Sequence, residues 1–90
     1  MSIHRYNAST DGNQKAIVQA LLDAGCRVHY IKQPVDLLVG FRGRNYLLEV
    51  KQPKKSKTTP AQDLFFATWS GQSVIVRTPE EALRAVGVAI

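Results

Sequence analysis

The sequence has too few of the residues from which several common classes of site are built. It has one cysteine, Cys26, and two histidines, His4 and His29. One cysteine forms no disulfide within the chain, and these three residues supply no cluster of the kind that binds structural zinc. The sequence also lacks an apolar run near the roughly 18 residues of a membrane helix, and it shows no signal peptide. We therefore expect a cytoplasmic protein that makes no membrane contact.

What the chain does contain is the composition of one small globular domain. Its 90 residues are 44% hydrophobic and 21% charged, as in ordinary globular domains. A chain of this length buries only about 60 to 65% of its unfolded surface, so its stability alone is modest and dimerisation would add to it. We expect a single domain over residues 1–90.

Residues 35–52 show the pattern of a β-hairpin. Two apolar runs, 37–41 and 46–50, flank a polar turn at 42–45. Side chains alternate along a strand, so one face of this hairpin is an unbroken apolar surface. The opposite face carries Asp36, Leu38, Gly40, Leu47, Glu49 and Lys51.

Two carboxylates and an amine therefore meet at the open end of the hairpin. A two-residue loop at 43–44 would place Asp36 opposite Lys51 and Leu38 opposite Glu49. One interpretation is an ordinary cluster of surface ion pairs. The other is a buried site, because the strands are apolar on both faces and the two carboxylates would repel each other without a cation. A hard divalent cation beside the lysine would make a site that cleaves phosphodiesters.

The net charge of +5 comes from one stretch of the chain. Residues 42–57 hold six basic residues and one acidic residue, whereas the rest of the chain is neutral. We interpret this stretch as a surface that follows nucleic-acid phosphates next to the carboxylates. The alternative is a solvated lysine-rich loop. Apart from Lys51, the basic residues concerned are Arg42, Arg44, Lys54, Lys55 and Lys57.

The remaining segments predict three helices and two further strands. A strand, a helix and a strand in succession place the last strand parallel to the second strand of the hairpin. The result is an α/β fold with a mixed four-stranded sheet flanked by helices. The helices are predicted from Asp11, in a capping box with Gln14, to about 24, from Thr59 to Gly71, and from Thr78 to about 86; the strands are predicted at 26–31 and 73–77.

The second predicted helix is unusually apolar. It carries Phe65, Phe66 and Trp69, which we expect to fill the core, with a dimer surface as the alternative. Its start combines Thr59 as a cap with Gln62 closing a capping box. That pairing gives Gln62 a structural role that needs no ligand.

The order of these motifs resembles the PD-(D/E)XK nucleases, and among them the VRR-NUC family. The resemblance rests on Pro34-Val35-Asp36 and Glu49-Val50-Lys51 in the hairpin. It continues through Asp11-Gly12-Asn13-Gln14 on the first helix and Trp69-Ser70-Gly71 near the end of the second, and so covers nearly the whole chain. Many members of the superfamily carry a glutamate on the first helix, where this chain has Gln14. That residue is either part of a cap or part of the site.

The resemblance implies a restriction-endonuclease-like αβββαβ core with an extra C-terminal helix. It also implies that Asp36, Glu49 and the backbone carbonyl of Val50 hold one or two Mg²⁺ or Mn²⁺ ions. Lys51 would then orient or deprotonate the attacking water, and Gln62 would bind the nucleophile or the phosphate. These residues together would hydrolyse phosphodiester bonds of DNA.

Small standalone proteins of this type resemble bacterial or phage homodimers that act on branched DNA in repair and recombination. The resemblance therefore implies a structure-selective endonuclease for DNA similar to a Holliday junction, in the cytoplasm of a bacterial or phage-infected cell. Two alternatives stay open. One is a non-catalytic nucleic-acid-binding module with the nuclease fold, and the other is a nuclease subunit that needs a partner.

Overall fold

The computed structural model describes residues 5–54 and 57–89 and forms a small α/β domain. Its elements follow the predicted order of helix, three strands, helix, strand and helix. No helix in the described ranges is long and apolar enough to cross a membrane. The elements are α1 (Arg5–Asp23), β1 (Arg27–Tyr30), β2 (Leu37–Phe41), β3 (Arg44–Val50), α2 (Pro60–Thr68), β4 (Ser73–Val76) and α3 (Pro79–Ala85).

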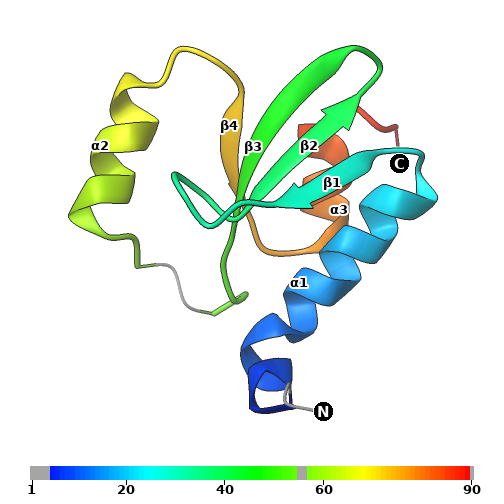
Figure 1. Cartoon of the computed structure of the whole chain (residues 1–90), viewed down its shortest axis with the longest axis horizontal. Helices are drawn as coiled ribbons and strands as arrows, with labels where there is room; N and C mark the ends of the chain where they lie inside the picture. Colours follow the sequence, from blue (N-terminus) through cyan, green and yellow to red (C-terminus); the bar gives the residue numbers. More distant parts are fainter. Residues whose placement is uncertain (1–4, 55–56, 90) are drawn as a thin grey trace.

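The four strands form one mixed sheet in the order β1-β2-β3-β4 (Figure 1). β1 pairs antiparallel with β2, and β2 pairs antiparallel with β3, as short connections between them allow. β4 pairs parallel to β3, with Glu49 beside Ile75 and Val50 beside Val76. The predicted parallel pair is therefore confirmed, and α2 lies in the connection between its two strands.

The predicted register of the hairpin is wrong by two residues. The two-residue turn is Arg42-Gly43, with φ of 52° and 80°, so both turn residues are left-handed as in the type I′ turns that suit hairpins. The guanidinium of Arg42 lies 4.8 Å from the centroid of the preceding Phe41 ring. Leu38 consequently pairs with Leu47 and not with Glu49.

A shift of two residues leaves every side chain on its predicted face, because the pleat repeats every two residues. It changes which residues meet across the strands. Asp36 precedes β2 by one residue, and the observed register continued by one step brings it opposite Glu49 in place of Lys51. The two carboxylates are thus closer together than the predicted register implied.

The core lies between one face of the sheet and the helices α1 and α3 (Figure 1). The predicted apolar face of the hairpin is the one that they cover. Tyr46 and Val50 on the same face pack against this core as half-buried residues. The buried residues of this core come from α1 (Ile17, Val18, Leu21), the strands (Leu37, Val39, Leu48, Val76), and α3 with the residue that caps it (Ala82, Val86), together with Cys26.

Helix α1 begins earlier than predicted. It starts at Arg5, so Asp11 and Gln14 lie inside the helix and do not form its N-terminal capping box. The Asp-Gly pair that suggested a start does not interrupt the helix. The predicted end is confirmed, because Gly25 has a φ of 99° and the N–H of Cys26 bonds to the carbonyl of Leu21 at 3.0 Å.

Helix α2 stands apart from α1 and α3 (Figure 1) and contains no buried residue. Phe65 and Phe66 are half-buried, while Trp69, just after the helix, is 49% exposed. The Phe65 ring contacts the rings of Phe66 and Trp69, with centroids 5.3 and 5.2 Å apart. The prediction that these aromatics fill the core is therefore wrong, because α1 and α3 already cover the apolar face of the sheet.

Candidate functional site

The second face of the sheet carries the candidate site. We call it the open face and define it by the side chains of Leu38, Leu47 and Glu49, which point away from α1 and α3. Glu49 is 5% exposed and is the one charged residue that is buried in the described part of the chain. A buried carboxylate is costly unless it has partners. The surroundings of Glu49 therefore decide what this face can do.

Two other side chains contact the Glu49 carboxylate directly. The amide of Gln62 donates a hydrogen bond from Nε2 to Glu49 Oε2 at 2.7 Å. The ammonium of Lys51 lies 3.3 Å from the same oxygen and 3.3 Å from Gln62 Oε1. Glu49, Lys51 and Gln62 thus each contact the other two. We call these three residues and Asp36 the acidic cluster.

Gln62 reaches this cluster because of the way α2 begins. Thr59 accepts a hydrogen bond from the Gln62 N–H at 3.1 Å, and its own N–H donates to Gln62 Oε1 at 3.3 Å. This is the predicted capping box. The cap and the contact with Glu49 occur together, because Oε1 serves the helix end and Nε2 serves the carboxylate.

Asp36 is held by the backbone on both sides. Its carboxylate Oδ2 accepts a hydrogen bond from the N–H of Val50 at 2.8 Å. Its carbonyl accepts a hydrogen bond from the N–H of Ile31 at 2.9 Å. The loop before β2 is therefore fastened to the end of β3. Val50 contributes its N–H to this contact, and the metal-binding role of its carbonyl stays a prediction.

The electrostatics of Glu49 reflect this crowding. Burial raises the pKa of Glu49 above its ordinary value, and the negative charge of Asp36 raises it further. The hydrogen bonds from Gln62 and Lys51 and the charge of Lys51 lower the pKa, but less strongly. The Lys51 ammonium pairs with Glu49. Two carboxylates and one ammonium therefore leave a net charge of −1 in the cluster when both acids are ionised.

The carboxylate oxygens of Asp36 and Glu49 are the kind of ligand that hard divalent cations prefer. Each carboxylate gives one oxygen to the contacts above, Oδ2 of Asp36 and Oε2 of Glu49. Mg²⁺ is commonly bound by one or two carboxylates together with waters and substrate phosphates. No group of three or more histidine, cysteine, aspartate or glutamate side chains suited to a metal occurs among residues 5–54 and 57–89. A cation here would therefore depend on the substrate and on water for its other ligands.

A contact that sequence reasoning missed joins α1 to the end of β3. Asn13 Nδ2 donates to the Lys51 carbonyl at 2.8 Å and to the Arg77 carbonyl at 3.4 Å. The Lys51 N–H in turn donates to the carbonyl of Val76 at 3.0 Å. Asn13, rather than the predicted Gln14, supplies this link from α1. The backbone of Lys51 is thus held from two sides.

The predicted nucleic-acid-binding residues fall into two groups at opposite ends of β3. Arg42 and Arg44 are exposed at the hairpin turn. Lys54 and Lys57 are exposed in the loop that comes after the acidic cluster, and Lys55 lies outside the described residues. The basic residues therefore frame the open face at its two ends.

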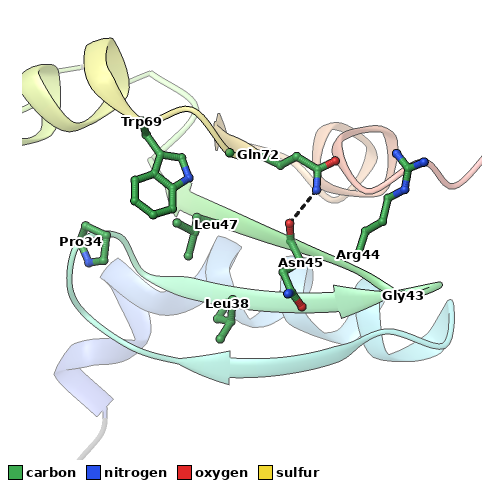
Figure 2. Close-up of a pocket in the computed structure, with 9 residues that line it drawn as sticks. Pro34, Leu38, Gly43, Arg44, Asn45, Leu47, Trp69 and Gln72 are labelled. Carbon is green, nitrogen blue, oxygen red and sulfur yellow. Dashed lines mark hydrogen bonds between the residues drawn. The ribbon is translucent and has the colours of Figure 1, made fainter.

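Sequence reasoning also missed a cavity of about 710 Å³ on the open face. Figure 2 shows the Trp69 ring above Leu47 at one end and Arg44 at the other end. The cavity was not predicted because Trp69 was expected in the core. Strand alternation had placed Leu38 and Leu47 on the same face as the two carboxylates. Its lining is Pro34, Leu38, Gly43, Arg44, Asn45, Leu47, Trp69, Gly71 and Gln72.

Comparison with known protein families, curated proteins and solved structures found no match for this chain. Any function proposed for the protein therefore rests on the geometry of the open face. That face brings together Asp36, Glu49 and Lys51, which the strand alternation predicted, with Gln62, which only the resemblance placed at the site.

Proposed function

We propose that this protein is a metal-dependent nuclease of the VRR-NUC type, which hydrolyses phosphodiester bonds of DNA. The observation that carries the proposal is the acidic cluster. Glu49 is buried beside a second carboxylate and an ammonium, although a hydrophobic side chain at this position would fold at lower cost. Such expensive arrangements are concentrated at functional sites, which makes the cluster the best candidate for chemistry in this chain.

In this proposal Asp36 and Glu49 hold Mg²⁺ or Mn²⁺. The cation, when bound, supplies an acidified water and neutralises charge on the phosphate. Lys51 would place a positive charge beside the same phosphate, because its ammonium already points at the Glu49 carboxylate. Gln62 holds Glu49 in place and could pass its hydrogen bond to a phosphate oxygen or to the attacking water.

The proposed DNA path runs along β3. Arg42 and Arg44 stand at one end of this strand, and Lys54 and Lys57 are exposed beyond the other end. Lys51 lies between the two pairs. These are five of the six basic residues in the stretch 42–57, from which the net charge of +5 comes. A duplex or branched DNA that spans both pairs would bring a phosphate to the acidic cluster between them.

The finer proposal is a homodimer that cuts branched DNA similar to a Holliday junction. Its support is the exposed apolar surface of α2, where Leu64 is 65% exposed and no residue is buried. A two-fold pairing of such surfaces would set two sites against two strands. Sedimentation at assay concentration tests this part alone, and a monomer that cleaves junctions would remove the dimer but keep the nuclease.

The test of the nuclease uses labelled branched, nicked and linear DNA with Mg²⁺, with Mn²⁺ and with EDTA. The wild-type protein should give products only with metal. Asp36→Asn and Lys51→Met should abolish cleavage, whereas Asp23→Asn and Lys15→Met, on the exposed surface of α1, should not. Cleavage retained in both cluster variants, with unchanged circular dichroism, would refute the assignment.

One observation favours the alternative of a non-catalytic DNA-binding module. Glu49 already has Lys51 and Gln62 as partners within the protein, so its carboxylate is hydrogen-bonded without a cation. The module predicts equal DNA binding with Mg²⁺ and with EDTA and no products in either. A nuclease subunit that needs a partner predicts the same result until the partner protein is added.

A further inference from the structure

The cavity on the open face adjoins the acidic cluster. Its floor contains Leu38 and Leu47, which pair across β2 and β3. Leu47 and Glu49 are two residues apart on the same face of β3, which corresponds to about 7 Å along a strand. A ligand in the cavity would therefore reach the acidic cluster within the length of about one nucleotide.

The tryptophan at one end of the cavity is a fixed flat surface. A Cβ atom added to Gly71 would lie 2.7 Å from Trp69 Nε1, so the indole lies directly against the glycine backbone. The ring of Phe65 supports it from the helix at a centroid distance of 5.2 Å. Trp69 nevertheless stays 49% exposed, and Figure 2 shows its ring above Leu47. An exposed aromatic ring of this kind is the usual platform on which proteins stack unpaired bases.

The other end of the cavity is polar and positively charged. Arg44 stands there in Figure 2, and Gln72 Nε2 donates a hydrogen bond to the Asn45 carbonyl at 2.8 Å. A DNA strand that runs from the acidic cluster along β3 would pass Trp69 first and the guanidinium of Arg44 last. This order matches the alternation of base and phosphate in a nucleic acid. The volume of about 710 Å³ is within the range of small-ligand sites.

We propose that this cavity binds an unpaired DNA base, stacked on Trp69, beside the phosphate at the acidic cluster. The proposal rests on the proposed nuclease function and specifies its substrate class. A base within a duplex is covered on both sides by its neighbours and cannot reach the indole. The enzyme would thus select a site at which a strand is single or splayed, such as a flap, a fork or the centre of a junction.

The test uses the fact that Trp69 is the only tryptophan of the chain. Its fluorescence therefore reports on this cavity alone. In EDTA, so that no cleavage occurs, an eight-residue oligothymidylate should quench the fluorescence. A blunt duplex and an abasic oligomer of equal length should leave the fluorescence nearly unchanged, although both have a phosphate backbone.

Variants separate the ring from the charge. Trp69→Ala should weaken binding of a dye-labelled oligothymidylate roughly 5- to 150-fold, the range expected for loss of one stacked base, and Trp69→Phe should restore part of it. Gly71→Ala keeps the fluorophore but displaces the ring, so both quenching and affinity should fall. The matched control is Leu22→Ala, which removes an exposed apolar side chain from α1 outside the cavity.

Equal quenching by the abasic oligomer would overturn the proposal, and so would unchanged affinity in a folded Trp69→Ala variant. If that variant fails to fold, fluorescence quenching of the wild-type protein by the oligothymidylate, the duplex and the abasic oligomer still tests the proposal. The result is distinct from that of the cleavage assay. Base-dependent quenching without cleavage would support the cavity and count against the nuclease, whereas cleavage without base-dependent quenching would do the reverse.

Discussion

The hydrogen bond from the Val50 N–H to Asp36 gives a prediction that separates structure from catalysis. Asp36→Ala removes the acceptor and leaves a part-buried N–H without its partner at 2.8 Å. The cost of such a loss is about 1 to 3 kcal/mol. A domain of 90 residues has a total stability of about 5 to 13 kcal/mol, so the loss is a substantial fraction.

Asp36→Asn changes the charge but keeps an acceptor oxygen. It also removes the negative charge that disfavours ionised Glu49, which works in favour of stability. Both variants remove that charge, so the difference in unfolding free energy between Asn and Ala isolates the hydrogen bond to Val50. We expect Asn to be close to the wild-type protein and Ala to be about 1 to 3 kcal/mol less stable than Asn.

The assay is urea unfolding at pH 7, monitored by circular dichroism and by the fluorescence of Trp69. With the slope of about 1 to 2 kcal/mol per molar urea expected for a small domain, the two midpoints should differ by roughly 0.5 to 3 M. Neither variant should cleave DNA. Equal midpoints for the two variants would refute the assigned hydrogen bond, and cleavage by Asp36→Asn would refute the role of its charge.

Three further predictions concern the charge of Glu49, the cap of α2 and the two faces of β3. Burial and Asp36 raise the pKa of Glu49, so the folded state binds the proton of this carboxyl more tightly than the unfolded state does. The free energy of unfolding should therefore fall as the pH rises above the ordinary glutamate pKa of 4.5. Glu49→Gln should therefore gain stability relative to the wild-type protein in urea melts at pH 7 but not at pH 4. Thr59→Ala should lose about 1 kcal/mol through the capping box of α2, measured by thermal unfolding, and an unchanged melting temperature would argue against that cap. Leu48→Ala should cost about 3 to 5 kcal/mol, because Leu48 is 0% exposed in the core. Leu47→Ala, one residue away on the open face, should cost less than half as much, and equal urea midpoints would contradict the assignment of the two faces.

Most of the secondary structure could be predicted because its signals are local. The glycine at Gly25 and the Thr-Pro starts at Thr59 and Thr78 act on the backbone within a few residues, and the structure confirms all three. The start of α1 at Arg5 was missed because its first turns contain no comparable signal. The turn at Arg42 was missed because a left-handed non-glycine residue has no strong signature.

The acidic cluster could be predicted in part. Alternation along the strands placed Asp36, Glu49 and Lys51 on one face, and an error of two residues in register preserved that face. The resemblance implied that Gln62 binds the nucleophile or the phosphate, and local reasoning assigned it to the capping box. Neither predicted its hydrogen bond to Glu49. Asn13 had no local signal, since its partners are backbone carbonyls 38 and 64 residues away.

The sequence by itself determined which side chains share a face, because the pleat of a strand and the caps of a helix depend on near neighbours in the chain. Only the tertiary structure decided which face the helices cover. α1 and α3 together enclose one side of the sheet, and the crossover that makes β4 parallel leaves α2 without a buried residue. That arrangement exposes Trp69 and creates the cavity beside Glu49, since both depend on packing between segments that are distant in the sequence.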